Sequence, residues 1–161
     1  MAELTAGVYL GEGFSGAEYE PALRSVAARA ASAVVLVAVE EARIVGAVTV
    51  ATRGGEWAEQ AGPGEAVIRM LVVHADARRG GAGADLVLAC VEQARADGCT
   101  AVRLSTQPDM IAAHRLYDRL GFERAPDYDW RPIPTVELLG YVLALDAEPV
   151  TPPDPGAAAR P

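Results

Sequence analysis

The stretch at residues 70–86 constrains the fold of this chain more than any other part. An apolar run ending at Val73 is short enough to be one buried strand, and it leads through two arginines and three glycines into a helical pattern. Glycines at such a turn let the backbone come close to a bound group, and a helix beginning there adds unpaired amide N–H groups and the positive end of its dipole. Arg78 and Arg79 add full positive charges. The stretch therefore predicts a cradle for an anion.

The spacing within the cradle restricts which anion it suits. There is no Gly-Lys-Ser or Gly-Lys-Thr of a Walker loop, and a dinucleotide fingerprint fails because position 86 is Leu86. The spacing that does fit is Leu-x-Val followed by Arg-x-x-Gly-x-Gly. The residues of this pattern are Leu71, Val73, Arg78, Gly81 and Gly83. The alternative is an ordinary glycine-rich turn between a strand and a helix, with solvated arginines.

Length and composition indicate one acidic globular domain. The chain has 161 residues, of which 51% are hydrophobic, and this is enough for a packed core. Its net charge of −8 argues against a broad basic face, so we expect no nucleic-acid partner. The acidity is compatible both with plain solubility and with a preference for a cationic substrate such as an amine, and charge alone does not separate the two.

Metal, redox and membrane roles find little support in the sequence. The two cysteines, Cys90 and Cys99, show neither metal-ligand spacing nor a C-x-x-C pair, and Cys90 falls on the apolar side of an expected helix. With only two histidines, we expect no zinc site. No apolar run reaches the ~18 residues of a membrane span, and the N-terminus lacks the pattern of a signal peptide. We therefore expect a cytoplasmic protein with no membrane partner.

In the first half of the chain, apolar periodicity predicts a helix followed by a hairpin. Residues 3–10 are ambiguous between a helix and a short strand. A helix is expected to about residue 31, with a capping box at Ser15 and Glu18 and with Pro21 in its first turn. Residues 33–39 and 44–51 read as two antiparallel strands, the first of them buried on both faces. Glycine-rich residues 53–64 read as a loop.

The second half of the chain alternates helices and strands. The helix after the cradle is expected to end near Asp97, with Gly98 as its left-handed cap. Residues 101–105 form a strand, and Thr106 with Asp109 is expected to cap a helix that stops at Gly121. Two closing strands begin at residue 122 and span residues 136–145. The proline- and alanine-rich residues 147–161 read as a disordered tail, which leaves residues 1–146 as the domain.

A second motif, at residues 113–122, reads Ala-His-Arg-Leu-Tyr-Asp-Arg-Leu-Gly-Phe and lies about 35 residues after the cradle. Together the two motifs resemble those of the GCN5-related N-acetyltransferases, the GNAT family, in residue types, order and spacing. The resemblance covers roughly residues 17–146. It implies an α/β fold with a mixed, mostly antiparallel central sheet, helices on both faces and a splayed parallel strand pair. The first strand of that fold has no convincing counterpart in residues 1–16, so we expect it to be missing.

The resemblance also implies acetyl-CoA as the cofactor, with its pantetheine arm in the splayed opening. Backbone groups of Leu71 and Val73 would pair with that arm, the cradle would hold the pyrophosphate, and the amide N–H of Val73 would stabilise the oxyanion. The residues expected to bind the cofactor are Leu71, Val72, Val73, Arg78, Arg79, Gly80, Gly81, Ala82, Gly83, Ala84, His114 and Tyr117.

Three positions carry the expected chemistry or depart from the family pattern. Tyr117 would protonate the departing thiolate, because a phenol with a pKa near ~10 stays protonated at neutral pH; the alternative is a core tyrosine. Many members place a glutamate within the strand before the cradle to take the amine's proton. Here the only candidate base is Glu65, at the start of that strand, and a water chain is the alternative. An asparagine often found seven residues before the tyrosine is replaced by Met110.

The leading interpretation is an acetyl-CoA-dependent N-acetyltransferase that acts on a small amine. The alternative is a non-catalytic acyl-CoA-binding or regulatory module. The residues expected near the acceptor are Trp57, Glu59, Tyr128, Asp129 and Trp130, although Trp57 reads equally well as a packed lid over the core. Without a first strand, residues 33–39 would form an open edge, to be covered either by residues 3–10 or by a second subunit. We therefore expect a homodimer.

Overall fold

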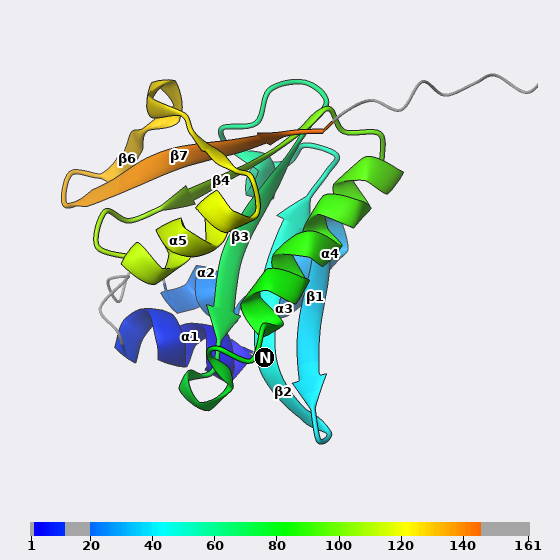
Figure 1. Cartoon of the computed structure of the whole chain (residues 1–161), viewed down its shortest axis with the longest axis vertical. Coiled ribbons are helices and arrows are strands. Elements are labelled where there is room, and N and C mark those ends of the chain that lie inside the picture. The colour runs from blue at the N-terminus through cyan, green and yellow to red at the C-terminus, as the bar shows by residue number, and fades with distance from the viewer. Residues whose placement is uncertain (1, 12–19, 146–161) are drawn as a thin grey trace, which may run out of the picture.

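The computed structural model describes residues 2–11 and 20–145 of the chain (Figure 1). The helices are α1 (Ala2–Gly11), α2 (Glu20–Arg24), α3 (Val26–Ser32), α4 (Ala82–Ala96) and α5 (Ile111–Arg119). The strands are β1 (Val34–Glu40), β2 (Arg43–Ala51), β3 (Glu65–Val73), β4 (Ala101–Thr106), β5 (Glu123–Arg124), β6 (Trp130–Ile133) and β7 (Val136–Ala144). No helix in these residues is both long and apolar enough to cross a membrane.

The strands form one seven-stranded sheet in the order β1-β2-β3-β4-β7-β5, and β6 pairs with β7. All neighbours are antiparallel except β3 and β4, which run parallel. Helices cover both faces, with α4 crossing β1–β3 on one of them (Figure 1). The expected fold class, a mixed and mostly antiparallel sheet with one parallel pair, is confirmed.

Two apolar clusters hold the sheet between its helices. The larger cluster joins α4 and α5 to the sheet and includes Ile68 and Tyr117. The smaller cluster lies under α1 and includes Val67, Trp57 and Met70. Val67 and Ile68 are neighbours in β3 and enter different clusters, because successive side chains of a strand point to opposite faces.

A bulge in β3 opens the sheet. The register between β2 and β3 shifts between Ala47 and Thr49, and Met70 adopts a left-handed backbone conformation with φ of 54°. An extra residue in one strand bends that strand and ends regular pairing. The parallel pairing of β3 with β4 accordingly stops at Ile68 and Leu104, and residues 69–73 continue without a partner on β4. This gap is the predicted splay of the parallel strand pair, and it begins at the bulge.

The structure decides three points in the N-terminal half, the first of which the sequence left open between a helix and a strand. Residues 3–10 belong to helix α1, which packs against β2 and β3 and does not pair with β1. The expected helix to residue 31 is divided at Ser25 into α2 and α3, and its capping box at Ser15 and Glu18 lies outside the described residues. The third point concerns β1, which is an edge strand with an exposed face rather than a strand buried on both sides, because α4 covers only one face.

The C-terminal half is confirmed at α4 and corrected beyond it. Asp97 caps α4, and Gly98 follows with φ of 75°, as predicted. Helix α5 begins at Ile111 after Met110, not at a capping box formed by Thr106 and Asp109, because Thr106 is still the last residue of β4. Three strands rather than two close the sheet, since β6 forms a hairpin with β7. The expected tail at residues 147–161 lies outside the described residues.

Candidate active site

The cradle joins the end of β3 to the start of α4 through a 3₁₀ turn at Ala75–Ala77. Gly81 occupies the N-cap of α4 in a left-handed conformation with φ of 95°, and Arg79 is also left-handed with φ of 77°. A Cβ atom on Gly83 would lie 3.5 Å from Val73 Cγ2 and 3.6 Å from Leu116 Cδ2. The strand end, the cradle and the tyrosine-bearing helix α5 therefore meet at Gly83, which brings the two sequence motifs together.

The backbone of Val73 faces the splayed opening. The N–H of the next residue, His74, donates to Val45 O on β2 at 2.7 Å. Because residues in an antiparallel pair alternate between bonding the partner strand and pointing away from it, Val73 directs its N–H and C=O away from β2. Consistent with this direction, Arg78 Nε donates to Val73 O at 3.2 Å. The opening thus presents backbone groups of β3 that β4 does not use.

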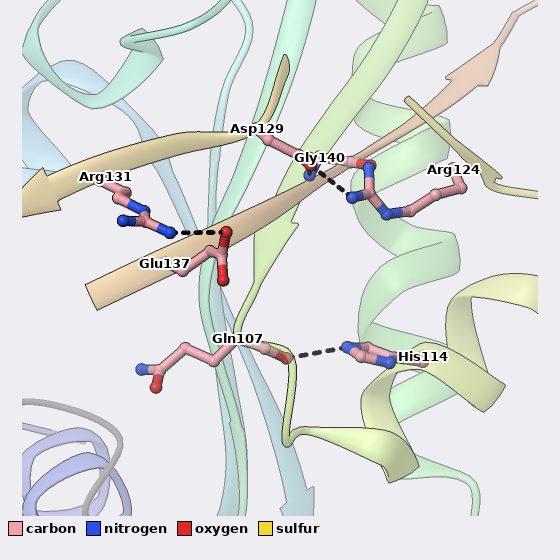
Figure 2. Close-up of polar contacts among 7 residues, drawn as sticks. All are labelled: Gln107, His114, Arg124, Asp129, Arg131, Glu137 and Gly140. Atoms are coloured by element: carbon pink, nitrogen blue, oxygen red, sulfur yellow. Dashed lines mark hydrogen bonds and ion pairs between the residues drawn. The ribbon is translucent and has the colours of Figure 1, made fainter. Parts of the chain in front are cut away.

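Tyr117 lies in the larger apolar cluster. Its side chain is only 6% exposed, and its ring centroid is 5.9 Å from those of Phe122 and Tyr141. Burial raises the pKa of the Tyr117 hydroxyl well above its ordinary value, so the phenol stays protonated. On the same helix, His114 Nε2 lies 2.9 Å from the backbone oxygen of Gln107, which ties α5 to the end of β4 (Figure 2).

A cavity of about 200 Å³ lies beside the splay, on the side of the β6–β7 hairpin. Its walls come from β3, β4, the start of α5 and the hairpin, and they are largely apolar or aromatic. The lining residues are Glu59, Gln60, Val67, Ile68, Arg69, Met70, Arg103, Leu104, Ser105, Thr106, Gln107, Met110, Tyr128, Trp130, Pro132, Ile133, Val136, Leu138 and Tyr141. This volume is below the range of about 300–1,000 Å³ typical of pockets for drug-sized ligands.

Three of the five residues expected near the acceptor line this cavity, namely Glu59, Tyr128 and Trp130. Trp57 does not, because it is buried in the smaller cluster with Arg69 stacked over its ring at 5.7 Å, as the packed-lid alternative required. The fifth residue, Asp129, does not line the cavity either, because its carboxylate forms hydrogen bonds outside it.

Asp129 clamps the chain where it enters β6. Its carboxylate accepts from Arg124 Nη2 at 2.6 Å and from the backbone N–H of Gly140 at 2.9 Å (Figure 2). Both hydrogen bonds lower the pKa of the Asp129 carboxyl, and the bond from Arg124 is the larger cause. The clamp holds the start of the hairpin that walls the cavity, so Asp129 shapes the cavity without lining it.

The Glu65 carboxylate is also engaged in hydrogen bonds, and these argue against its expected role as the base. Its carboxylate accepts from Arg103 through Nε and, at 2.6 Å, through Nη2, and it accepts from Gly62 N at 2.6 Å. The Arg103 hydrogen bond is the main cause that lowers the pKa of Glu65. A carboxylate held in this way is a weak base, and it is not among the groups that line the cavity.

Sequence reasoning missed Arg69, Arg103 and Tyr141 as cavity residues. Arg103 sits between two core residues in β4, so strand alternation suggests an outward, solvated side chain. Its partner Glu65 is 38 residues away in the sequence, and no local pattern connects the two. Tyr141 belongs to a long apolar strand in which nothing distinguishes one side of the sheet from the other.

Comparisons with known proteins agree with this geometry. Residues 8–122 match the family model described as the acetyltransferase (GNAT) family. Among curated proteins, no sequence match was found. By contrast, many solved structures resemble the structure of this chain.

Three solved structures illustrate the match. A GNAT-family acetyltransferase from Staphylococcus aureus has a TM-score of 0.71 at 15% identity, with 89% of this chain and 90% of that chain covered. The ribosomal-protein-alanine N-acetyltransferase from Brucella melitensis has a TM-score of 0.59 at 22% identity, with 78% of each chain covered. A Salmonella typhimurium protein solved with its cofactor acetyl-CoA has a TM-score of 0.63 at 19% identity, with 90% of this chain and 86% of that chain covered. At these identities the likeness establishes the fold.

Proposed function

The chain belongs to the acetyltransferase (GNAT) family, whose acyl donor is acetyl-CoA, and we propose that it transfers an acetyl group to the amine of a small acceptor. The observation that carries this proposal is the placement of the cradle and the cavity on either side of one opening in the sheet. A donor bound along β3 and an acceptor bound in the cavity would meet where residues 69–73 leave β4. The small volume of the cavity supports a small acceptor.

The residues of the opening fit acetyl-CoA. Backbone groups of residues 71–73 that β4 does not use, among them the N–H of Val73, suit an extended amide-containing arm, as an additional strand would. Gly81 and Gly83 carry no side chain that would cover the amides at the start of α4, and Arg78 and Arg79 add charge that complements a pyrophosphate. We therefore assign residues 71–73 and 78–84, with His114 and Tyr117 of α5, to the cofactor site.

The chain's own groups supply positioning and proton transfer, whereas acetyl-CoA supplies the activated acetyl thioester. The N–H of Val73 points into the opening and is a fixed donor for an oxygen that gains negative charge. The Tyr117 hydroxyl, kept protonated by burial, is the proton donor for the leaving thiolate. Since Arg103 holds Glu65, we assign the removal of the amine's proton to water rather than to Glu65.

Release of CoA thiol from acetyl-CoA and a panel of amines tests the proposal directly. Tyr117→Phe should lower kcat by about 10²- to 10⁴-fold, the usual contribution of a general acid. Acetyl-CoA affinity measured by calorimetry should barely change, because the two rings have the same shape. Normal turnover by this variant would reduce Tyr117 to a packing residue.

The paired state of Glu65 is the observation that favours the alternative, a non-catalytic acyl-CoA-binding or regulatory module. Such a module would bind acetyl-CoA as tightly as an enzyme would. It would release no CoA thiol with any amine above the rate of uncatalysed hydrolysis. The same assay therefore separates the two functions.

We also propose that the protein is a homodimer that pairs through the open edge of β1. Val37 and Val39 on this strand are 43% and 57% exposed, and neither lysine nor proline protects the edge. Helix α1 lies against β2 and β3, and no strand among the described residues pairs with the outer edge of β1, which leaves that edge to a second copy. Light scattering should show a dimer at micromolar concentration, and Val39→Lys should convert it to a monomer. A monomeric wild-type protein would contradict the proposal.

A further inference from the structure

Arg103 has one hydrogen-bonding group that the described part of the chain leaves unused. Its side chain is 11% exposed and lines the cavity. Nε and Nη2 donate to Glu65, while Nη1 is buried and has no hydrogen-bond partner among the described residues. The ring of Tyr128 lies 3.4 Å from the guanidinium carbon and covers one face of the group. The guanidinium is thus held on one edge and one face, with a donor remaining.

The remaining donor indicates what is missing from the cavity. All N–H bonds of a guanidinium lie in its plane, so the stacked ring of Tyr128 cannot accept from Nη1. A buried donor without an acceptor is costly, and buried polar groups without partners are uncommon in folded proteins. The pair with Glu65 also fixes the orientation of the guanidinium. Nη1 has almost no accessible surface while the Tyr128 ring lies over the guanidinium, so a bound molecule would complete the site by displacing that ring and placing an oxygen at this position.

The other walls describe the rest of that molecule. Most of them are apolar or aromatic, and they include Trp130 and Leu138 of the hairpin. Glu59 is the only carboxylate among the lining residues, and it lies 3.6 Å from Arg69. A cavity with two guanidinium groups and one carboxylate gives no advantage to an acceptor that carries several positive charges, such as a polyamine. The acidic net charge of the chain is therefore located elsewhere.

We propose that Arg103 Nη1 binds an oxygen that the acceptor carries beside its amino group, so that the acceptor is an apolar α-amino acid or its amide. This inference rests on the proposed function, whose acceptor class it specifies. Arg103 binds the carboxylate or carboxamide oxygen, and the apolar walls hold the side chain. Arg103 is a specificity determinant, and Glu65 positions it.

Three matched amines test the inference in the wild-type enzyme. Phenylalanine, phenylalaninamide and 2-phenylethylamine share one apolar body, and only the last lacks the oxygen. We expect kcat/KM to be about 10- to 100-fold higher for at least one of the first two, because the third amine leaves the buried donor unpaired. The first two distinguish a carboxylate from a carboxamide. Equal or better use of 2-phenylethylamine, or a preference for spermidine, overturns the inference.

Arg103→Lys tests the residue, and Arg131→Lys is its control. Lysine keeps the charge opposite Glu65 and loses the planar guanidinium, so the preference for the oxygen-bearing amine should fall to within about threefold of unity. The readout is the ratio of the two kcat/KM values, because Arg103 lines the cavity and its replacement acts on the absolute turnover of both amines. Arg131 is on β6 and pairs with Glu137 outside the cavity, so its variant should keep the wild-type preference (Figure 2). An unchanged preference in a folded Arg103→Lys protein contradicts the assignment.

The inference and the proposed function can fail separately. Turnover confined to amines without the oxygen supports an acetyltransferase and rejects the role of Arg103. If the protein binds acetyl-CoA and acetylates no amine, the proposed function fails, and calorimetry with CoA-loaded protein then decides. Tighter binding of phenylalanine or its amide than of 2-phenylethylamine supports the site, and equal binding or none rejects it.

Discussion

Replacing Glu65 with glutamine should destabilise the protein strongly, because it breaks a largely buried ion pair. The Glu65 and Arg103 side chains are only 16% and 11% exposed, and they are joined through two N–H groups of the guanidinium. Glutamine keeps the shape of the side chain. Its amide nitrogen would face a guanidinium N–H, and the charge that neutralises Arg103 would be lost.

The size of the expected destabilisation follows from the burial of the Glu65–Arg103 ion pair. Removing one partner of a buried ion pair costs about 3–5 kcal/mol, and the slight exposure of this pair lowers our expectation to about 2–4 kcal/mol. For a protein of this size, roughly 2–4 °C in Tm corresponds to each kcal/mol, so Tm should fall by about 5–15 °C. The matched control is Glu137→Gln, because the Arg131–Glu137 pair is 61% and 49% exposed. An exposed pair contributes only about 0–1 kcal/mol.

Urea denaturation followed over a range of pH gives the decisive measurement. The Arg103 guanidinium lowers the pKa of the Glu65 carboxyl below its ordinary 4.5 in the folded protein. The stability that this group contributes is therefore complete above about pH 4.5 and is lost as pH falls through the lowered folded pKa. The difference between wild type and Glu65→Gln should be constant near neutral pH and should narrow in acid. A neutral-pH difference no larger than that of Glu137→Gln would refute the reasoning.

Three further experiments test the cradle, a buried thiol and the residues with left-handed backbone. Gly83→Ala meets only ordinary contacts and should fold normally, whereas Gly83→Val should lose most of its acetyl-CoA affinity in calorimetry; a folded valine variant with wild-type affinity would contradict the cradle. Burial raises the pKa of Cys90 to about 12, so this thiol should resist Ellman's reagent in the native protein and react only in urea. Arg79→Gly should stabilise the protein by about 1 kcal/mol while weakening acetyl-CoA binding, and Ala42→Gly should stabilise it similarly without affecting binding, as thermal melts and calorimetry would show.

The parts of the site that the sequence predicted are those specified by local patterns. Residues 78–84 were placed at a strand-to-helix turn because glycine marks left-handed positions, and Gly81 and Gly98 both have positive φ. The apolar face of α5 follows from helical periodicity, which placed Tyr117 on the buried side. In both segments the physical cause acts within a few residues, so it is visible in the sequence.

The parts that escaped prediction depend on contacts between distant segments. Residues 3–10 have no strong periodicity, and their helix packs against β2 and β3. The β6 strand contains Pro132 and exists because it pairs with β7. The pairing of Glu65 with Arg103 similarly depends on the parallel alignment of β3 and β4, which brings residues 65 and 103 within reach of each other. Tertiary structure decides each of these features.

The opening itself depends on backbone strain that tertiary packing compensates. Met70 and Arg79 are two of the five non-glycine residues with positive φ in the described chain; Met70 directly precedes the residues assigned to the cofactor, and Arg79 is one of them. A left-handed conformation costs roughly 1–2 kcal/mol for a residue with a Cβ. At Met70 the side chain is buried in the smaller cluster, and fully burying such a side chain contributes about 1.5–3 kcal/mol, enough to offset the strain. Without that burial the left-handed conformation of Met70 would be unfavourable. We would then expect β3 to pair regularly with β4 past Ile68, which would close the opening. The packing under α1 thus holds open the site on the other side of the strand.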